Sequence, residues 1–92
     1  MAQRVGSFRF TRRFRKDYRG LPKQIQQAFD EKLGLFLQNM SHGSLRVKPI
    51  QGMKNRWEGS ISMKYRFTFE LSKDVVVFRS IGTHDIVDRE SD

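Results

Sequence analysis

Apolar and polar residues alternate strictly over residues 57–71. This period of two predicts β structure with one buried face. Because fifteen residues exceed the usual length of a strand, a turn must interrupt the run. One parity holds Trp57, Gly59, Ile61, Met63, Tyr65, Phe67, Phe69 and Leu71, and the other holds Glu58, Ser60, Ser62, Lys64, Arg66, Thr68 and Glu70.

The turn is expected at residues 62–64. An odd-numbered loop at this place pairs Ile61 with Tyr65 and keeps the apolar residues of both strands on one face. A two-residue turn would instead set Ile61 against Arg66, which is less favourable. The parity therefore predicts a hairpin whose polar face carries Arg66.

Three more segments have the pattern of strands. Residues 7–10 and 45–50 alternate, and residues 75–81 follow a turn at 72–74. Apart from Arg79 and Ser80, the segment 75–81 is apolar on both parities. Such a segment is typical of a strand in the interior of a sheet.

Two helices are expected before most of these strands. Residues 22–40 show helical spacing, and Lys32 is the only polar member of the apolar stripe. A shorter helix is predicted over residues 12–19, with Thr11 as its N-cap and Gly20 at its end. Pro22 suits the first turn of the longer helix.

Together these elements predict a single α+β domain over residues 1–92. A short N-terminal strand and two helices would accompany a twisted antiparallel sheet, with both helices packed on one face of it. The other face of the sheet would display the polar parity. Its charged members are expected to be Arg46, Lys48, Glu58, Lys64 and Arg66.

The charge of the chain is unevenly distributed. The net charge is +8, and residues 1–20 hold seven basic side chains and one acidic side chain, a balance of 7 − 1 = +6. A polyanion such as RNA is the natural partner, since neutralising phosphates releases counterions. The alternative is a solvated basic face that keeps the protein soluble. The candidate RNA-binding residues are Arg9, Arg12, Arg13, Arg15, Lys16, Arg46 and Lys64.

Composition argues against several other classes of protein. There is no cysteine, and His42 and His84 match no zinc spacing. No apolar run approaches the roughly 20 residues of a membrane span, and no apolar stretch follows the basic N-terminus. We therefore expect no metal, no cofactor, no membrane segment and no signal peptide, and a location in the cytoplasm.

Arg66 and His84 are the residue types that RNA cleavage without a metal would use. Histidine transfers protons near neutral pH, and arginine offers a rigid fork of donors to phosphate oxygens. Lys48, Lys54 or Lys64 would add positive charge, and Glu58 could share proton transfer. The alternatives are that His84 caps a turn and that Arg66 pairs with an acidic residue on a neighbouring strand. The patterns alone support a basic α+β domain that binds nucleic acid.

An ordered set of short motifs adds to this interpretation. The motifs are Phe10-Thr11-x-x-Phe14, Leu21-Pro22-x-x-Ile25, His42-Gly43-Ser44-Leu45, Trp57, Tyr65-Arg66-Phe67 and Ile81-Gly82-Thr83-His84-Asp85. In this order the chain resembles the RelE/ParE toxin superfamily over about residues 7–88. The likeness is greatest to the RelE/StbE-type and YafQ-like messenger-RNA interferases of bacterial type II toxin–antitoxin systems.

The resemblance implies an endoribonuclease that cuts messenger RNA on the ribosome and is silenced by a cognate antitoxin. It implies that Arg66 contacts the scissile phosphate and that His84 is the general acid. Lys48 and Lys54 would match the basic residues of the preceding strand and loop. The arginine-rich start of the chain would suit contacts with ribosomal RNA.

Two positions depart from the family pattern. Asp88 stands where relatives usually carry an aromatic residue, which could stack on a base, whereas an aspartate repels phosphate. Gly43 replaces the usual proline after His42. The alternative functions are a ParE-like inhibitor of DNA gyrase and a non-catalytic nucleic-acid-binding module. The pair Arg66 and His84 favours the nuclease, because the ParE branch generally lacks it.

Overall fold

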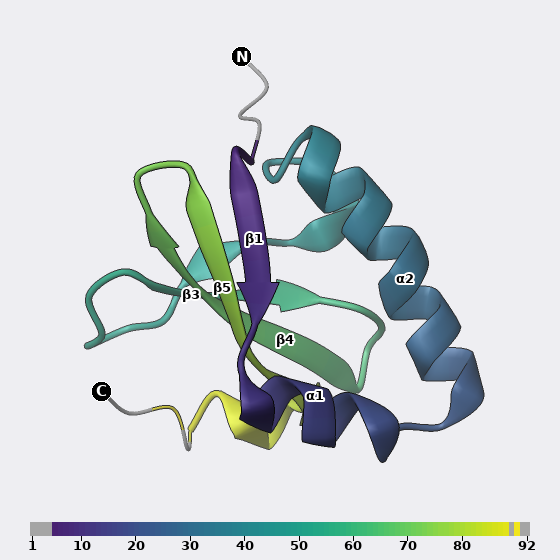
Figure 1. Ribbon diagram of the computed structural model, residues 1–92. Coiled ribbons are helices and arrows are strands. Elements are labelled where there is room, and N and C mark those ends of the chain that lie inside the picture. Colours follow the sequence, from purple (N-terminus) through teal and green to yellow (C-terminus); the bar gives the residue numbers. More distant parts are fainter. Residues whose placement is uncertain (1–4, 89, 91–92) are drawn as a thin grey trace.

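Two α-helices, two short 3-10 helices and a five-stranded sheet make up the described part of the protein (Figure 1). The computed structural model describes residues 5–88 and 90. Arg4, which was counted in the basic N-terminal segment, lies outside these residues. In chain order the elements are β1 (Ser7–Phe10), α1 (Arg12–Arg19), α2 (Lys23–Gln38), the 3-10 helix η1 (Gly43–Leu45), β2 (Lys48–Pro49), β3 (Arg56–Ser60), β4 (Tyr65–Ser72), β5 (Val75–Thr83) and the 3-10 helix η2 (His84–Ile86).

The strands lie in the order β1-β5-β4-β3-β2. Neighbours run antiparallel except β1, which pairs with β5 in parallel. The predicted α+β fold is therefore confirmed, with a mixed sheet where the sequence indicated an antiparallel one. The pattern of β1 shows a strand but not its direction. The segment predicted as an interior strand is β5, which lies between β1 and β4.

Phenylalanine rings join the helices to one face of the sheet. Phe29 and Phe36 of α2 make edge contacts with Phe67 of β4, at centroid distances of 5.6 and 5.9 Å. Both rings also contact Phe78 of β5, as does Phe14 of α1. All five side chains are buried. The apolar parity of the strands thus faces the helices, and the polar parity faces the other way.

The hairpin between β3 and β4 has the predicted register. Ser60 pairs with Arg66, and the Ile61 N–H donates to the Tyr65 carbonyl at 3.0 Å. The odd-numbered loop is confirmed. Lys64 lies in the loop and not on a strand.

The strand predicted over residues 45–50 is wrong for most of its length. Leu45 belongs to η1, and Arg46 follows in the left-handed conformation with φ of 48°. This backbone interrupts extended structure, so only Lys48–Pro49 forms β2. Because proline has no N–H to donate, β2 is suited to its place at the edge of the sheet.

A β-bulge in β5 changes which residues face the helices. Thr68 stands opposite Ser80 and Phe69 opposite Phe78, so Arg79 is the extra residue. Without the bulge, Phe78 and Ile81 could not both face the helices. The bulge also places Ser80 beside Thr68 on the opposite face, with the two hydroxyl oxygens 2.6 Å apart.

Thr11 connects α1 to this bulge. Its hydroxyl accepts a hydrogen bond from the Phe14 N–H at 3.0 Å and donates to the Arg79 carbonyl at 2.8 Å. The predicted N-cap is therefore confirmed, and it fixes the start of α1 against the sheet. No helix in the described part of the chain has the length and apolar character needed to cross a bilayer.

Candidate active site

Arg66 lies on β4 next to the turn at residues 61–64. Its Nη1 donates to three backbone carbonyls, those of Ser62 (2.5 Å), Met63 (3.1 Å) and Tyr65 (3.0 Å). The side chain is half-buried. A guanidinium has five N–H donors, so anchoring through Nη1 orients the group while other donors can serve an anion.

His84 lies beside the same turn. It follows the last residue of β5, is exposed, and its backbone N–H donates to the Lys64 carbonyl at 3.1 Å. Arg66 stands opposite Gly82, two residues before His84 in the chain. The fold therefore brings Arg66, His84 and Lys64 to one end of the sheet.

A basic hollow of about 310 Å³ borders Arg66. Among its described lining residues are three cations, Lys32, Arg46 and Arg66, and no carboxylate. Lys32 extends from α2 into this hollow, and its Nζ donates to the Ser44 carbonyl of η1 at 3.3 Å. Lys32 was not among the site residues predicted from the sequence. The signal was its polar character within the apolar stripe of α2.

Lys48 and Glu58 lie together on the neighbouring strands. They are direct partners in the β2–β3 pair, and Glu58 is also paired with Thr68 of β4. Both line a hollow of about 510 Å³ that Asp88 and Glu90 share. Along β3, Glu58 is two residues from Ser60, the partner of Arg66, which corresponds to about 7 Å. This hollow therefore adjoins the site of Arg66.

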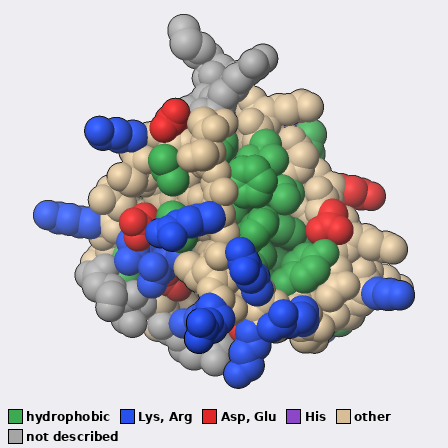
Figure 2. Space-filling view, viewed as in Figure 1, with side chains coloured by type: hydrophobic (Ala, Val, Ile, Leu, Met, Phe, Trp, Pro, Cys, Tyr) green, Lys and Arg blue, Asp and Glu red, His purple; other side chains and the backbone are tan. Residues whose placement is uncertain are grey.

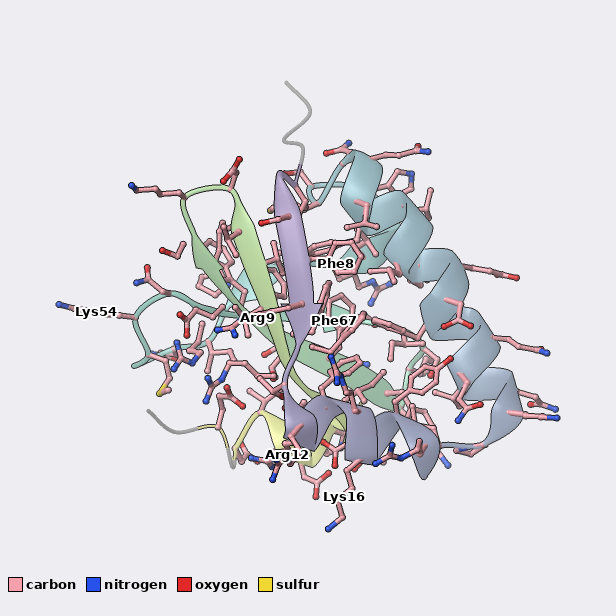
Figure 3. All side chains as sticks on the ribbon, viewed as in Figure 1. Phe8, Arg9, Arg12, Lys16, Lys54 and Phe67 are labelled. Atoms are coloured by element: carbon pink, nitrogen blue, oxygen red, sulfur yellow. The ribbon has the colours of Figure 1, made fainter. Side chains whose placement is uncertain are left out.

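Lys54 is not brought to this end of the sheet. It precedes Arg56, which pairs with Glu70, whereas Arg66 pairs with Ser60 at the other end of β3. Its exposed side chain lies at the edge of the molecule (Figure 3). The fold thus separates Lys54 from Arg66 and His84 by the length of a strand.

The basic residues of β1 and α1 are the remaining candidates for RNA binding. All five candidates are exposed, and Arg13 forms an ion pair with Asp17 at 3.9 Å. Figure 2 shows lysine and arginine side chains gathered over the lower part of the face in view, around α1. Figure 3 places Arg12 and Lys16 on α1, pointing outward. The five residues are Arg9, Arg12, Arg13, Arg15 and Lys16.

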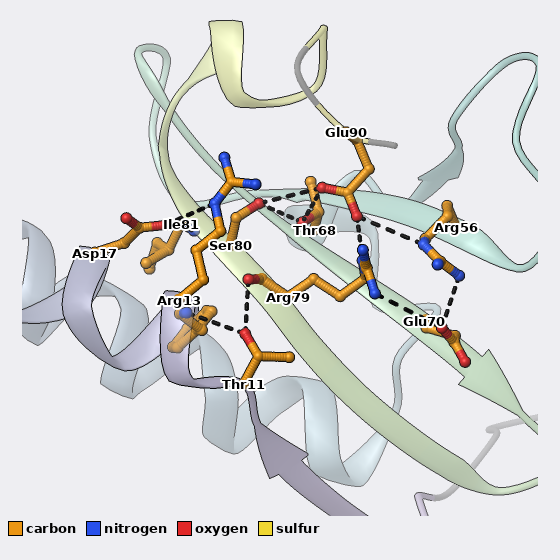
Figure 4. A network of polar contacts seen from close by, with 11 residues as sticks. Thr11, Arg13, Asp17, Arg56, Thr68, Glu70, Arg79, Ser80, Ile81 and Glu90 are labelled. Atoms are coloured by element: carbon orange, nitrogen blue, oxygen red, sulfur yellow. Dashed lines mark hydrogen bonds and ion pairs between the residues drawn. The ribbon is translucent and has the colours of Figure 1, made fainter. Parts of the chain in front are cut away.

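A polar network on the sheet face away from the helices was not predicted. It joins Arg56, Glu70 and Arg79 of the strands to Glu90 near the end of the chain (Figure 4). The weak signal in the sequence was the pair of polar residues, Arg79 and Ser80, within an otherwise apolar strand. Within residues 5–88 and Glu90, no three His, Asp or Glu side chains gather closely enough to hold a metal ion.

Comparisons by sequence identify no relative of this chain. No family model matches the sequence. No curated protein matches it either.

Comparison with solved structures gives clear matches. YafQ from Escherichia coli has a TM-score of 0.69 and 15% identity, over 92% of this chain and 98% of that one. One chain of the toxin–antitoxin complex RelBE2 from Mycobacterium tuberculosis has a TM-score of 0.71 and 20% identity, over 91% and 94% of the two chains. One chain of the RelB–RelE antitoxin–toxin complex from Methanococcus jannaschii has a TM-score of 0.66 and 20% identity, over 87% and 94%. The chain therefore has the RelE-like toxin fold over nearly its whole length.

Proposed function

We propose that this chain is a single-domain toxin of a type II toxin–antitoxin pair, a ribosome-dependent endoribonuclease that cuts messenger RNA in the cytoplasm. The observation that carries the proposal is that Arg66 and His84 both lie beside the turn at residues 61–64 of a RelE-like fold. The structures it resembles include toxin–antitoxin complexes, which supports a cognate antitoxin as its partner.

The proposed reaction uses the 2′-hydroxyl of the RNA as its nucleophile. A base removes the 2′ proton, the 2′ oxygen attacks the phosphorus, and the 5′ oxygen leaves with a proton. His84 is suited to donate that proton, and Arg66 to stabilise the charge on the phosphorane. Glu58 is the carboxylate nearest in the sheet to accept the 2′ proton, and Lys48 beside it supplies positive charge. Lys54, which precedes β3 at the end far from Arg66, would act only on a more distant part of the RNA.

Mapping messenger-RNA ends after expression without an antitoxin tests this proposal. The wild type is expected to give cuts in phase with codons. Arg66→Ala or His84→Ala should each lower cleavage by about 100-fold or more, because a positioned general acid and a positioned donor to the developing charge each contribute at least this much. Both variants should still bind the antitoxin, because neither side chain is part of the buried core.

Lys73→Gln is the matched control. Lys73 lies in the turn between β4 and β5, at the end of these strands that is opposite to Arg66 and His84. The Lys73→Gln variant should therefore cleave as the wild type does. If Arg66→Ala and His84→Ala also cleave at the wild-type rate, the assigned site is wrong. Intact transcripts with breaks in DNA would instead support the ParE-like alternative. Binding of RNA with neither effect would support the non-catalytic module.

A further inference from the structure

Glu90 places a carboxylate between two arginines on the sheet face away from the helices (Figure 4). Its Oε1 accepts a hydrogen bond from the Nε of Arg79 and lies 3.5 Å from the Nε of Arg56. Only 1% of the Glu90 side chain and 10% of the Arg56 side chain are exposed. Glu90 is therefore inserted into the surface of the sheet through its charged group.

Two hydroxyl groups complete the surroundings of this carboxylate. Its Oε2 lies 3.4 Å from Thr68 Oγ1 and 3.5 Å from Ser80 Oγ. Two guanidinium groups and two hydroxyls are also a donor set that proteins use for phosphate. A phosphodiester matches the carboxylate in charge, because each carries one negative charge shared by two oxygens.

Glu70 is the competing acidic group in this cluster. It accepts from Arg56 Nη1 at 2.7 Å and lies 3.9 Å from Arg79 Nη1. With both carboxylates in place, their two negative charges balance the two positive charges of the arginines. If Glu90 withdraws, the cluster keeps two positive charges and one negative charge, and thus a net charge that attracts an anion.

The cluster is next to the candidate active site. Thr68 is two residues from Arg66 on β4 and is paired with Glu58. Glu90 also lines the hollow of about 510 Å³ that contains Lys48, Glu58 and Asp88. A ligand in this hollow would therefore lie against Glu90.

We infer that Arg56, Arg79, Thr68 and Ser80 form a phosphate-binding site that Glu90 occupies from within the same chain. A phosphate of the ligand takes the place of the carboxylate, and Glu90 withdraws. The identification of the ligand as RNA rests on the function proposed above. The phosphate site itself does not.

Binding of inorganic phosphate to the free protein tests the inference. Glu90→Gln keeps the size of the side chain but removes its charge, so isothermal titration should show phosphate binding at least about tenfold tighter than in the wild type. Glu31→Gln is the matched control, because Glu31 is exposed on α2 and its loss changes the net charge equally. Equal phosphate affinity in the two variants would overturn the inference.

The wild type gives a second measurement should Glu90→Gln fail to fold. The side-chain Nε–H resonances of Arg56 and Arg79 should shift on addition of phosphate but not of chloride at the same ionic strength. Resonances that do not respond to phosphate would contradict the site. Neither measurement needs a ribosome, so the two proposals can fail separately. Phosphate binding without messenger-RNA cleavage refutes only the nuclease, and cleavage without phosphate binding refutes only this site.

Discussion

At the scale of single residues, Gly59 shows how closely the sheet is packed under the helices. Gly59 of β3 stands opposite Phe67 of β4. A Cβ atom at Gly59 would lie 2.3 Å from Cζ of the Phe67 ring, far inside van der Waals contact. The ring is 1% exposed and is surrounded by other phenylalanines, so it has little room to move. The close packing of the core therefore depends on the absence of a side chain at Gly59.

Gly59→Ala is expected to lower the free energy of unfolding by about 1–3 kcal/mol, the usual cost of overpacking. Gly34→Ala is the matched control in α2, where an added Cβ would meet nothing within 4 Å. It should raise the free energy of unfolding by up to about 1 kcal/mol, because alanine favours a helix over glycine. Urea unfolding of both variants measures the two changes. Equal effects of the two substitutions would show that Phe67 can move aside.

At the scale of elements, a hydrogen bond joins the two helices. The Tyr18 hydroxyl of α1 donates to Oδ1 of Asp30 of α2 at 2.8 Å. Desolvation by burial, this hydrogen bond and the negative charge of Asp30 raise the pKa of Tyr18 above its ordinary value. The phenol is therefore stabilised in its protonated form by the folded protein.

This shift makes the stability of the protein depend on alkaline pH. The pKa of Tyr18 is higher in the folded than in the unfolded state. The contribution of Tyr18 to the free energy of unfolding is therefore fully present below the unfolded pKa of about 10, and it is lost as the pH rises through the folded pKa. Ultraviolet absorbance of tyrosinate should show Tyr18 ionising at higher pH than an ordinary tyrosine. Asp30→Asn should move that titration back toward the ordinary value. An unchanged titration would mean that Asp30 does not act on Tyr18.

The elements that the sequence predicted well are those whose pattern is local. Strict alternation in residues 57–71 was enough to predict the turn and its register, because a slip by one residue would expose every apolar side chain. The segment 45–50 has the same alternation, but the left-handed conformation of Arg46 interrupts it. Alternation carries no information about a single residue with positive φ.

The candidate site was likewise predictable where its residues belong to local motifs. Arg66 and His84 stand in motifs and were found from the sequence, and the fold places both at one turn. The network around Glu90 depends on contacts between residues far apart, such as Arg56 and Glu90, and on a bulge at Arg79. Neither feature has a periodicity, so only the three-dimensional structure reveals them.

At the scale of the whole molecule, positive charge gathers on α1 even at the start of the helix, where it is destabilising. Helix α1 has no acidic residue in its first turn, and Arg12 and Arg13 stand there instead. Positive charge at a helix N-terminus opposes the helix dipole. Arg12 also lies one turn from Lys16, and like charges at this spacing repel each other. A bound polyanion would relieve both effects, which supports α1 as a contact surface for RNA.

The salt dependence of RNA binding tests this surface. Log K for a single strand falls with log salt concentration by about 0.7 for each phosphate neutralised. Replacing Arg12 and Lys16 by glutamine should therefore reduce the slope by about 1.4 if each side chain meets one phosphate. Lys23→Gln with Lys73→Gln is the matched control, because both lysines are exposed and lie outside α1. The control loses the same net charge and should keep nearly the wild-type slope. If both double variants lose the same slope, RNA responds only to the total charge of the protein, and α1 is not a defined contact surface.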